Sequence, residues 1–289
     1  MSATWYCCRQ RAGPLVKECR ALRPVLRHDD LPSEQRGKLE SRKHIRTAVN
    51  RSDKDRIELR LATIGWDATH YVLTFDDEHL PKNYSGVQTA LRSFIKTVRR
   101  WRARLGKPPD FDWLAVIEGK HGDHRWHVHF VADYYELSPA EVCSLWRFGF
   151  PDDDDQSFVG ALVLLDQKGF RRLAEYLDKE ARPVGKRKFS CSRSLDRKIA
   201  EPCRWEASSG TIRPSKSAVC VSYIHGTEPE QWDNGWGKYR KLSWLVPDNS
   251  LACQRALQRM GLKVAKASRA RVRADVRDIT CKGSGNFET

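Results

Sequence analysis

The pattern of apolar positions between residues 70 and 132 changes from strand to helix and back to strand. Residues 70–75 form a run of β-branched and aromatic side chains that is typical of a strand. Between Ser85 and Gly106, apolar residues recur every three or four positions, which predicts an amphipathic helix with these two residues as N-cap and stop. Residues 112–118 and 125–132 predict two more strands, separated by a polar turn.

The next segment adds a helix, a strand and another helix. The sequence Ser138-Pro139-Ala140-Glu141 combines an N-cap, a proline at the first helical position and a capping-box glutamate. Residues 158–165 predict a fourth strand, and residues 169–181 predict a helix. The first six elements follow the order of the ferredoxin-like split βαβ arrangement, so an α+β fold with a central antiparallel sheet is expected.

The third predicted strand carries the chemistry. Residues two apart in a strand point to the same face, so His127 and His129 project together while Trp126, Val128 and Phe130 project from the other face. In a ferredoxin-like sheet this strand is central and helices cover one face. The apolar face is expected to pack under the helices, which leaves the two imidazoles on an open face.

A metal site with a nucleophile is the chemistry that these residue types suggest. Two neighbouring imidazoles and the carboxylate of Glu118 can hold a divalent cation and leave positions open for substrate oxygens. A tyrosine on a nearby helix can attack a phosphodiester that such a cation polarises. Tyr176 lies off the apolar stripe of its predicted helix, and Lys179 shares its face.

Composition narrows the class of partner. The chain has 289 residues with a net charge of +15, which indicates a polyanionic partner such as nucleic acid. No apolar run approaches the roughly 20 residues that span a bilayer, and the N-terminus has no signal-peptide core, so a cytoplasmic location and no membrane are expected. Nine cysteines without a Cys-x-x-Cys pair argue against a zinc ribbon.

Charge and pattern together divide the chain into three parts. Residues 1–55 are predicted to form a basic N-terminal extension, residues 56–200 a catalytic domain, and residues 201–289 a C-terminal extension with a basic tail. The sequence leaves the roles of the two extensions open. The acidic run at residues 152–155 is expected to be a solvated turn.

Three short motifs resemble those of HUH endonucleases, the rolling-circle replication initiators and relaxases. His127-Val128-His129 resembles the motif of two histidines around a hydrophobic residue, and residues 71–75 resemble the family's first motif. Tyr176-x-x-Lys179 resembles the motif that contains the nucleophilic tyrosine. The basic segment at residues 186–195 is similar to a stretch in replication-associated proteins of bacterial plasmids and phages. The resemblance covers roughly residues 60–200.

The resemblance implies an enzyme, a metal-dependent nickase-ligase that acts on single-stranded or hairpin origin DNA in a bacterial cytoplasm. Mg²⁺ or Mn²⁺ would be held by His127, His129 and Glu118. Tyr176, assisted by Lys179, would form a 5′-phosphotyrosine and release a 3′-OH for a polymerase to extend. No Gly-x-x-x-x-Gly-Lys-[Ser/Thr] loop occurs in the chain, so strand separation would need a host helicase.

Several alternatives stay open. Asp76 and Glu78 are rival carboxylates, and His121 and His124 are rival imidazoles that could also build a zinc site with the two strand histidines. The chemistry also fits a relaxase or a transposase, and a non-catalytic ferredoxin-like nucleic-acid-binding module is the main alternative outside the enzymes.

Contact with DNA is expected from the basic segment after the nucleophile's helix. The residues predicted to hold the strand are Lys186, Arg187, Lys188 and Arg193. The polar side of the helix at residues 85–106 also carries six cations, as a solvated face or as phosphate contacts; they are Arg92, Lys96, Arg99, Arg100, Arg102 and Arg104.

Overall fold

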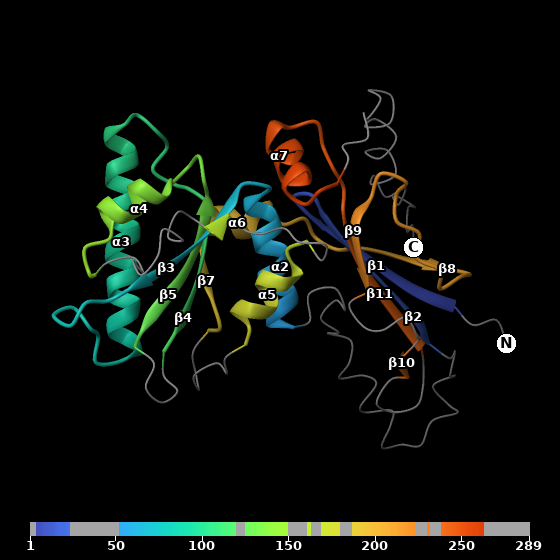
Figure 1. Cartoon of the computed structure of the whole chain (residues 1–289). Coiled ribbons are helices and arrows are strands. Elements are labelled where there is room, and N and C mark those ends of the chain that lie inside the picture. Colours follow the sequence, from blue (N-terminus) through green and yellow to red (C-terminus); the bar gives the residue numbers. More distant parts are fainter. Residues whose placement is uncertain are drawn as a thin grey trace, which may run out of the picture.

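Two antiparallel sheets, separated and flanked by helices, form the protein (Figure 1). The computed structural model describes residues 4–23, 52–119, 125–149, 161–162, 169–179, 187–223, 230–231 and 238–262. The helices of these segments are α2 (Asp53–Ile64), α3 (Tyr84–Arg104), α4 (Pro139–Leu145), α5 (Arg171–Leu177), α6 (Arg193–Lys198) and α7 (Leu251–Arg259). The fold is therefore α+β, as expected.

A five-stranded sheet carries the histidine strand in its centre. Its strands lie in the order β6 (Ala161–Leu162), β3 (Ala68–Thr74), β5 (His127–Asp133), β4 (Trp113–Glu118) and β7 (Ser190–Cys191). All of its pairings are antiparallel. Strand β5 thus has a hydrogen-bonded neighbour on each side, which fixes its register along its whole length.

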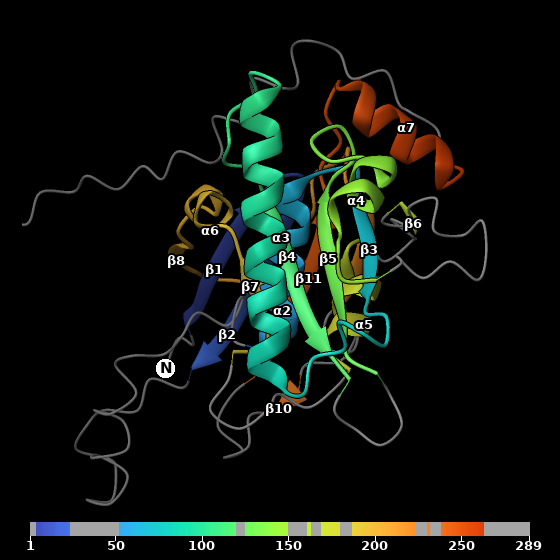
Figure 2. The same ribbon diagram turned by 90° about the vertical axis from the view of Figure 1, so that its left-hand side faces the viewer.

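Helix α3 covers one face of this sheet (Figure 2). Val128 and Phe130 of β5 pack against Phe94 and Val98 of α3 in one buried cluster, as the alternation along the strand predicted. The side chain of Asn83, rather than that of Ser85, caps the helix by accepting from the Gly86 N–H.

The ends of α3 and α4 test the capping signals. Gly106 follows the last turn of α3 with a φ of 70°, as expected of a stop. The preceding Leu105 lies beyond the helix and is exposed, so its predicted place in the apolar stripe was wrong. The capping box between Ser138 and Glu141 is confirmed at the start of α4.

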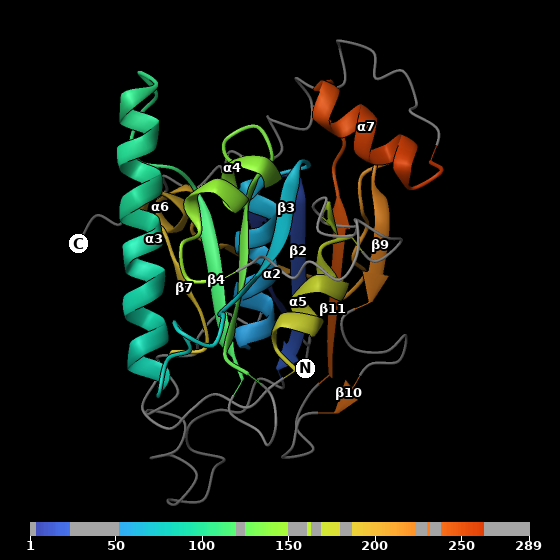
Figure 3. The same ribbon diagram turned by 60° about the vertical axis from the view of Figure 1, so that its left-hand side comes forward.

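Helices also lie on the second face of the five-stranded sheet, and the prediction that helices cover only one face was wrong. Leu114, Val116 and Val131 on this face belong to a buried cluster with α2 and α5 (Figure 3). Because these apolar residues share the face of His127 and His129, most of that face must be shielded from water.

A six-stranded sheet lies on the far side of α2 and is built from both ends of the chain. Its path is β10 (Glu230–Gln231), β11 (Lys238–Leu245), β2 (Leu15–Arg23), β1 (Thr4–Ala12) and β8 (Cys203–Ala207), with β9 (Val219–Tyr223) paired to β11. Segments from both predicted extensions thus pair with each other. Helix α2 lies between the two sheets and packs against Ala12, Leu15 and Leu245 of this one.

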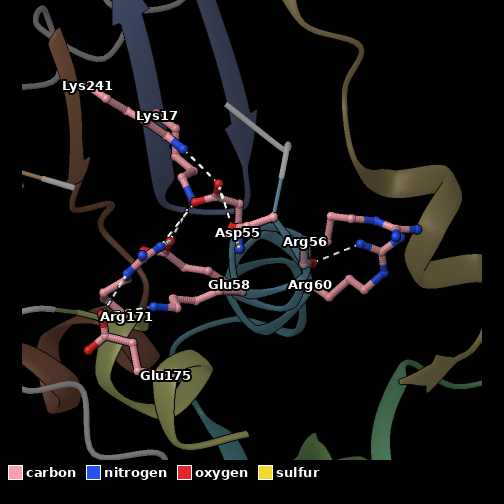
Figure 4. Close-up of polar contacts among 10 residues, drawn as sticks. Lys17, Asp55, Arg56, Glu58, Arg60, Arg171, Glu175 and Lys241 are labelled. Carbon is pink, nitrogen blue, oxygen red and sulfur yellow. Dashed lines mark hydrogen bonds and ion pairs between the residues drawn. The ribbon is translucent and has the colours of Figure 1, made fainter. Parts of the chain in front are cut away.

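A buried ionic cluster joins the six-stranded sheet to α2 and α5 (Figure 4). Lys17 of β2 lies 2.7 Å from Asp55 and 2.6 Å from Glu58, both on α2, and none of the three side chains is more than 4% exposed. Lys241 of β11 adds an ion pair of 2.7 Å to Asp55. Arg171, the first residue of α5, pairs with Asp55 and Glu58 at 3.0 and 3.1 Å. Five ionisable side chains therefore connect three elements that are distant in sequence.

The predicted strand at residues 158–165 is described only as β6, Ala161–Leu162, and the acidic run at residues 152–155 lies outside the described residues. Among the helices that the structure describes, none is long and apolar enough to cross a membrane.

Candidate active site

The ends of β4 and β5 bring a carboxylate and two imidazoles together. Glu118, the last residue of β4, lies directly opposite His127, the first residue of β5. His129 follows two residues later on the same face, opposite Val116 of β4 and Val72 of β3. The register of both pairings is regular, so strand alternation alone aims the three side chains into one space.

The three side chains form a compact donor set. Glu118 Oε2 lies 3.0 Å from His129 Nε2 and 3.4 Å from His127 Nε2. One ligand atom from each residue falls within 4.8 Å of the other two, which suits coordination of one ion. The Glu118 and His129 side chains are 1% exposed and that of His127 is 22% exposed, so the site opens to solvent on the His127 side.

The buried atoms of this set fit a divalent cation. Both carboxylate oxygens of Glu118 and Nε2 of His129 are buried and make no hydrogen bond within the described residues. Buried polar atoms without such partners are costly, and a bound cation would satisfy all three. Burial raises the pKa of Glu118, but His127, His129 and Lys179 outweigh it and hold that pKa well below its usual range. A charged carboxylate beside two imidazoles is a donor set that suits Mg²⁺ or Mn²⁺.

The apolar neighbours of Glu118 are compatible with its role as a ligand. Alternation along β4 places Leu114 and Val116 on the same face as Glu118, which conflicts with an open face. The structure removes this conflict without a bulge, because α2 and α5 cover Leu114 and Val116 while Glu118 ends the strand at the rim.

Gly119 allows the strand ends to come this close. Its φ is 124°, a conformation that side chains other than glycine rarely adopt. A Cβ at this position would lie 2.6 Å from the Cα of Trp126, the residue before His127. A larger residue would therefore push apart the two strand ends that pair Glu118 with His127.

His70 is a member of the site that the sequence analysis did not single out. Its Nε2 lies 2.9 Å from Nδ1 of His129. Burial and the neighbouring His129 lower the pKa of His70 to about 3, so its ring is neutral at pH 7. A neutral His70 can accept a hydrogen bond from Nδ1–H of His129, which leaves Nε2 of His129 directed at Glu118. Its even position in β3, two residues before Val72, was the signal for its face.

Helix α5 places the predicted nucleophile beside the histidines. The Tyr176 ring lies 5.3 Å from the ring of His129 and 6.2 Å from that of His70, measured between centroids. Tyr176 is 44% exposed, so its side chain is accessible. Nothing in the sequence separation of residues 129 and 176 required this proximity.

Lys179 links the nucleophile to the acid. Its Nζ lies 4.1 Å from the centre of the Tyr176 ring and 3.2 Å from Glu118 Oε2. Partial burial lowers the pKa of Lys179, but Glu118 and Tyr176 outweigh it, so this pKa is raised and the ammonium is charged at pH 7.

The rival ligands lie elsewhere or outside the described residues. Asp76 binds the backbone N–H and the ring of His79, with 2.8 Å to Nδ1, and it does not join the donor set. Glu78 does not join it either. His121 and His124 fall outside the described residues, as does any zinc site built on them.

The residues predicted to hold DNA are in different surroundings. Arg187 is exposed, and its carbonyl oxygen accepts from the Tyr84 hydroxyl at 3.4 Å. The Lys188 side chain is 6% exposed, with Nζ at 3.9 Å from Asp178. Arg193 is exposed at the start of α6. Lys186 lies outside the described residues.

Comparison with known proteins supplies a family. Residues 69–181 match the family of the replication-associated protein ORF2. The matched segment runs from β3 to the end of the tyrosine motif and so contains Glu118, both histidines of β5, Tyr176 and Lys179. The match confirms the resemblance to replication-associated proteins of the rolling-circle initiator type. No curated protein and no solved structure matched the chain.

Proposed function

Because residues 69–181 match the replication-associated protein ORF2 family, we propose that the chain is an HUH endonuclease that starts rolling-circle replication. It nicks single-stranded or hairpin origin DNA through Tyr176 and rejoins strands by the reverse reaction. The five-stranded sheet then corresponds to the ferredoxin-like split βαβ core, with β3 and β5 as its central pair.

One observation carries the proposal: the Tyr176 ring lies 5.3 Å from the ring of His129, next to a donor set of one carboxylate and two imidazoles. A binding module that lacks catalysis has no need for an accessible tyrosine beside such a set. A phosphodiester that reaches the Glu118–His127–His129 site lies within reach of the Tyr176 hydroxyl.

Each residue of the site has a separate task. Glu118, His127 and His129 hold Mg²⁺ or Mn²⁺, which supplies positive charge to the phosphate oxygens. The Tyr176 oxygen forms a bond to phosphorus, and the bond between phosphorus and the 3′ oxygen of the preceding nucleotide breaks. The phenolic proton ends on the released 3′-OH, so the step needs no nucleotide cofactor.

Lys179 stabilises the charge that develops in this step. Its ammonium faces both the Tyr176 ring and the Glu118 carboxylate. It favours the phenolate form of Tyr176 at the moment of attack and can bind a phosphate oxygen. His70 keeps the His129 ring oriented and does not contact the substrate in this scheme.

The covalent intermediate provides the test. Purified protein is incubated with single-stranded DNA of its own element and Mn²⁺, and protein–DNA adducts are separated on denaturing gels. Tyr176→Phe is expected to abolish the adduct while DNA binding stays nearly unchanged, and His127→Ala is expected to abolish it through loss of the metal. Tyr135→Phe is the matched control, because Tyr135 is also an exposed tyrosine. An adduct that persists in Tyr176→Phe refutes the assignment, and DNA binding without any adduct favours a non-catalytic module.

The proposal also implies partners. A host helicase would separate the strands and a host polymerase would extend the 3′-OH, in the cytoplasm of a bacterial host.

A further inference from the structure

A half-open cleft of about 390 Å³ lies between α3 and the β4–β7 side of the five-stranded sheet. Figure 2 shows α3 in front of these two strands. The cleft has apolar walls from Leu91, Ile95 and Trp113. It lies on the α3 face of the sheet, whereas Glu118, His127 and His129 point to the other face.

Three cations line this cleft. Arg92, Lys96 and Arg99 are spaced i, i+4 and i+7 on α3, so they share one face of the helix. No carboxylate is among the described residues that line the cleft, and Arg92 and Lys96 form no ion pair with described residues. Arg99 pairs at 3.0 Å with Asp110, which is exposed. Like charges at this spacing repel each other, and a bound anion removes that repulsion.

Trp113 gives a second reason to place a ligand here. Its ring lines the cleft and stacks on Phe130, with centroids 6.1 Å apart. Its indole nitrogen is buried and has no hydrogen-bond acceptor among the described residues. A buried donor without an acceptor is uncommon in folded proteins, and an oxygen-rich ligand at the edge of the ring would supply one.

A chain of contacts connects the cleft to the metal site. Trp126 precedes His127, and its ring lies 6.3 Å from the ring of Tyr84, the first residue of α3. The Tyr84 hydroxyl donates to the carbonyl of Arg187, and Ser190, three residues later, lines the cleft. One turn along α3 from Tyr84, Gln88 lines the cleft as well. Two aromatic rings therefore lie between the two sites, at a place where unpaired bases can stack.

The length of the charged stripe identifies the ligand class. Seven residues of helix separate Arg92 from Arg99, which is about 10 Å along the axis. That span exceeds one phosphate group and suits successive phosphates of a strand. We propose that this cleft binds the sugar–phosphate backbone of the single DNA strand that leaves the metal site past Trp126 and Tyr84. The inference rests on the proposed function for the identity of the strand.

The test uses two double variants of one helix. Arg92→Glu with Lys96→Glu changes the cleft, and Arg100→Glu with Arg104→Glu makes the same charge change at exposed positions that do not line it. Binding of fluorescein-labelled oligo(dT) of increasing length is measured by anisotropy in EDTA over a series of KCl concentrations. Circular dichroism verifies that both variants keep their helix content.

The cleft variant is expected to lose at least about tenfold in affinity for long oligo(dT) relative to the control variant, while the shortest oligonucleotides bind both alike. The slope of log K against log salt should fall by about 1.4, for two lost phosphate contacts on a single strand. Equal losses in the two variants, or a loss that does not depend on length, overturn the inference. Because EDTA prevents cleavage, failure here is distinct from failure of the adduct test, which reports on Tyr176.

Discussion

Removal of one charge from the buried ionic cluster is expected to destabilise the whole protein. Asp55→Asn keeps the shape of the side chain and removes the carboxylate that receives Lys17 and Lys241 at 2.7 Å and Arg171 at 3.0 Å. Among the described residues, Asp55 is the carboxylate that pairs with Lys241. Lys241 is 3% exposed, so the variant leaves an ammonium buried without a counter-ion.

The expected loss of unfolding free energy is about 3–5 kcal/mol, the typical cost of removing one partner of a buried ion pair. Most of this cost comes from the cations left behind. Asp55→Asn combined with Lys241→Met should therefore recover at least about 1 kcal/mol relative to Asp55→Asn alone. Asp53→Asn is the matched control, because Asp53 lies in the same first turn of α2 but forms an exposed pair with Arg56. Its expected cost is about 0–1 kcal/mol.

Urea unfolding followed by circular dichroism measures these differences, and a pH series adds a second check. Burial raises the pKa of Asp55, but Lys17 and Lys241 outweigh it and hold that pKa below its usual value of 3.8. The contribution of Asp55 is therefore fully present above about pH 3.8 and is lost as the pH falls below it. The variant should lack this part of the acid dependence. If Asp55→Asn costs no more than Asp53→Asn, the cluster does not stabilise the contact between the two sheets.

Three further predictions concern the candidate active site. Glu118→Gln should weaken Mn²⁺ binding by more than about 100-fold in calorimetric titrations, because a neutral amide replaces the charged ligand, and an unchanged affinity would exclude Glu118 as a ligand. His70→Phe should weaken it by about 10–100-fold in the same titration, because His129 loses the group that orients it; wild-type affinity would leave His70 without this role. Lys179→Met should leave Mn²⁺ binding in place and slow adduct formation by about 100-fold in rapid-quench assays, and an unchanged rate would show that the ammonium does not assist Tyr176.

Local patterns were sufficient to predict the elements around the site. The helical period of α3, the capping box of α4 and the alternation in β5 each depend on neighbours within one element. The shared face of His127 and His129 followed from the strand alone. The role of His70 required knowledge that β3 and β5 are neighbours, because its face relative to His129 depends on their register.

The six-stranded sheet was beyond local patterns for a physical reason. In β2, Lys17 and Glu18 are consecutive and both fully buried, which contradicts the alternation of polar and apolar positions that reveals most strands. Each depends on partners from other segments: Lys17 on Asp55 and Glu58, and Glu18 on Arg9 and Arg20. A sequence without these pairings shows only a basic segment. The apolar cover over the histidine face was missed for a related reason, because α2 lies before the predicted core motifs.

The central claim is that Tyr176 attacks DNA at a site built by Glu118, His127 and His129. The most direct measurement is mass spectrometry of the proteolysed adduct formed with Mn²⁺ and single-stranded origin DNA. The proposed mechanism predicts a 5′-phosphonucleotide on the peptide that contains Tyr176 and on no other tyrosine peptide. A nucleotide mapped to a different tyrosine, or a cleaved strand with no protein-bound product, would contradict it.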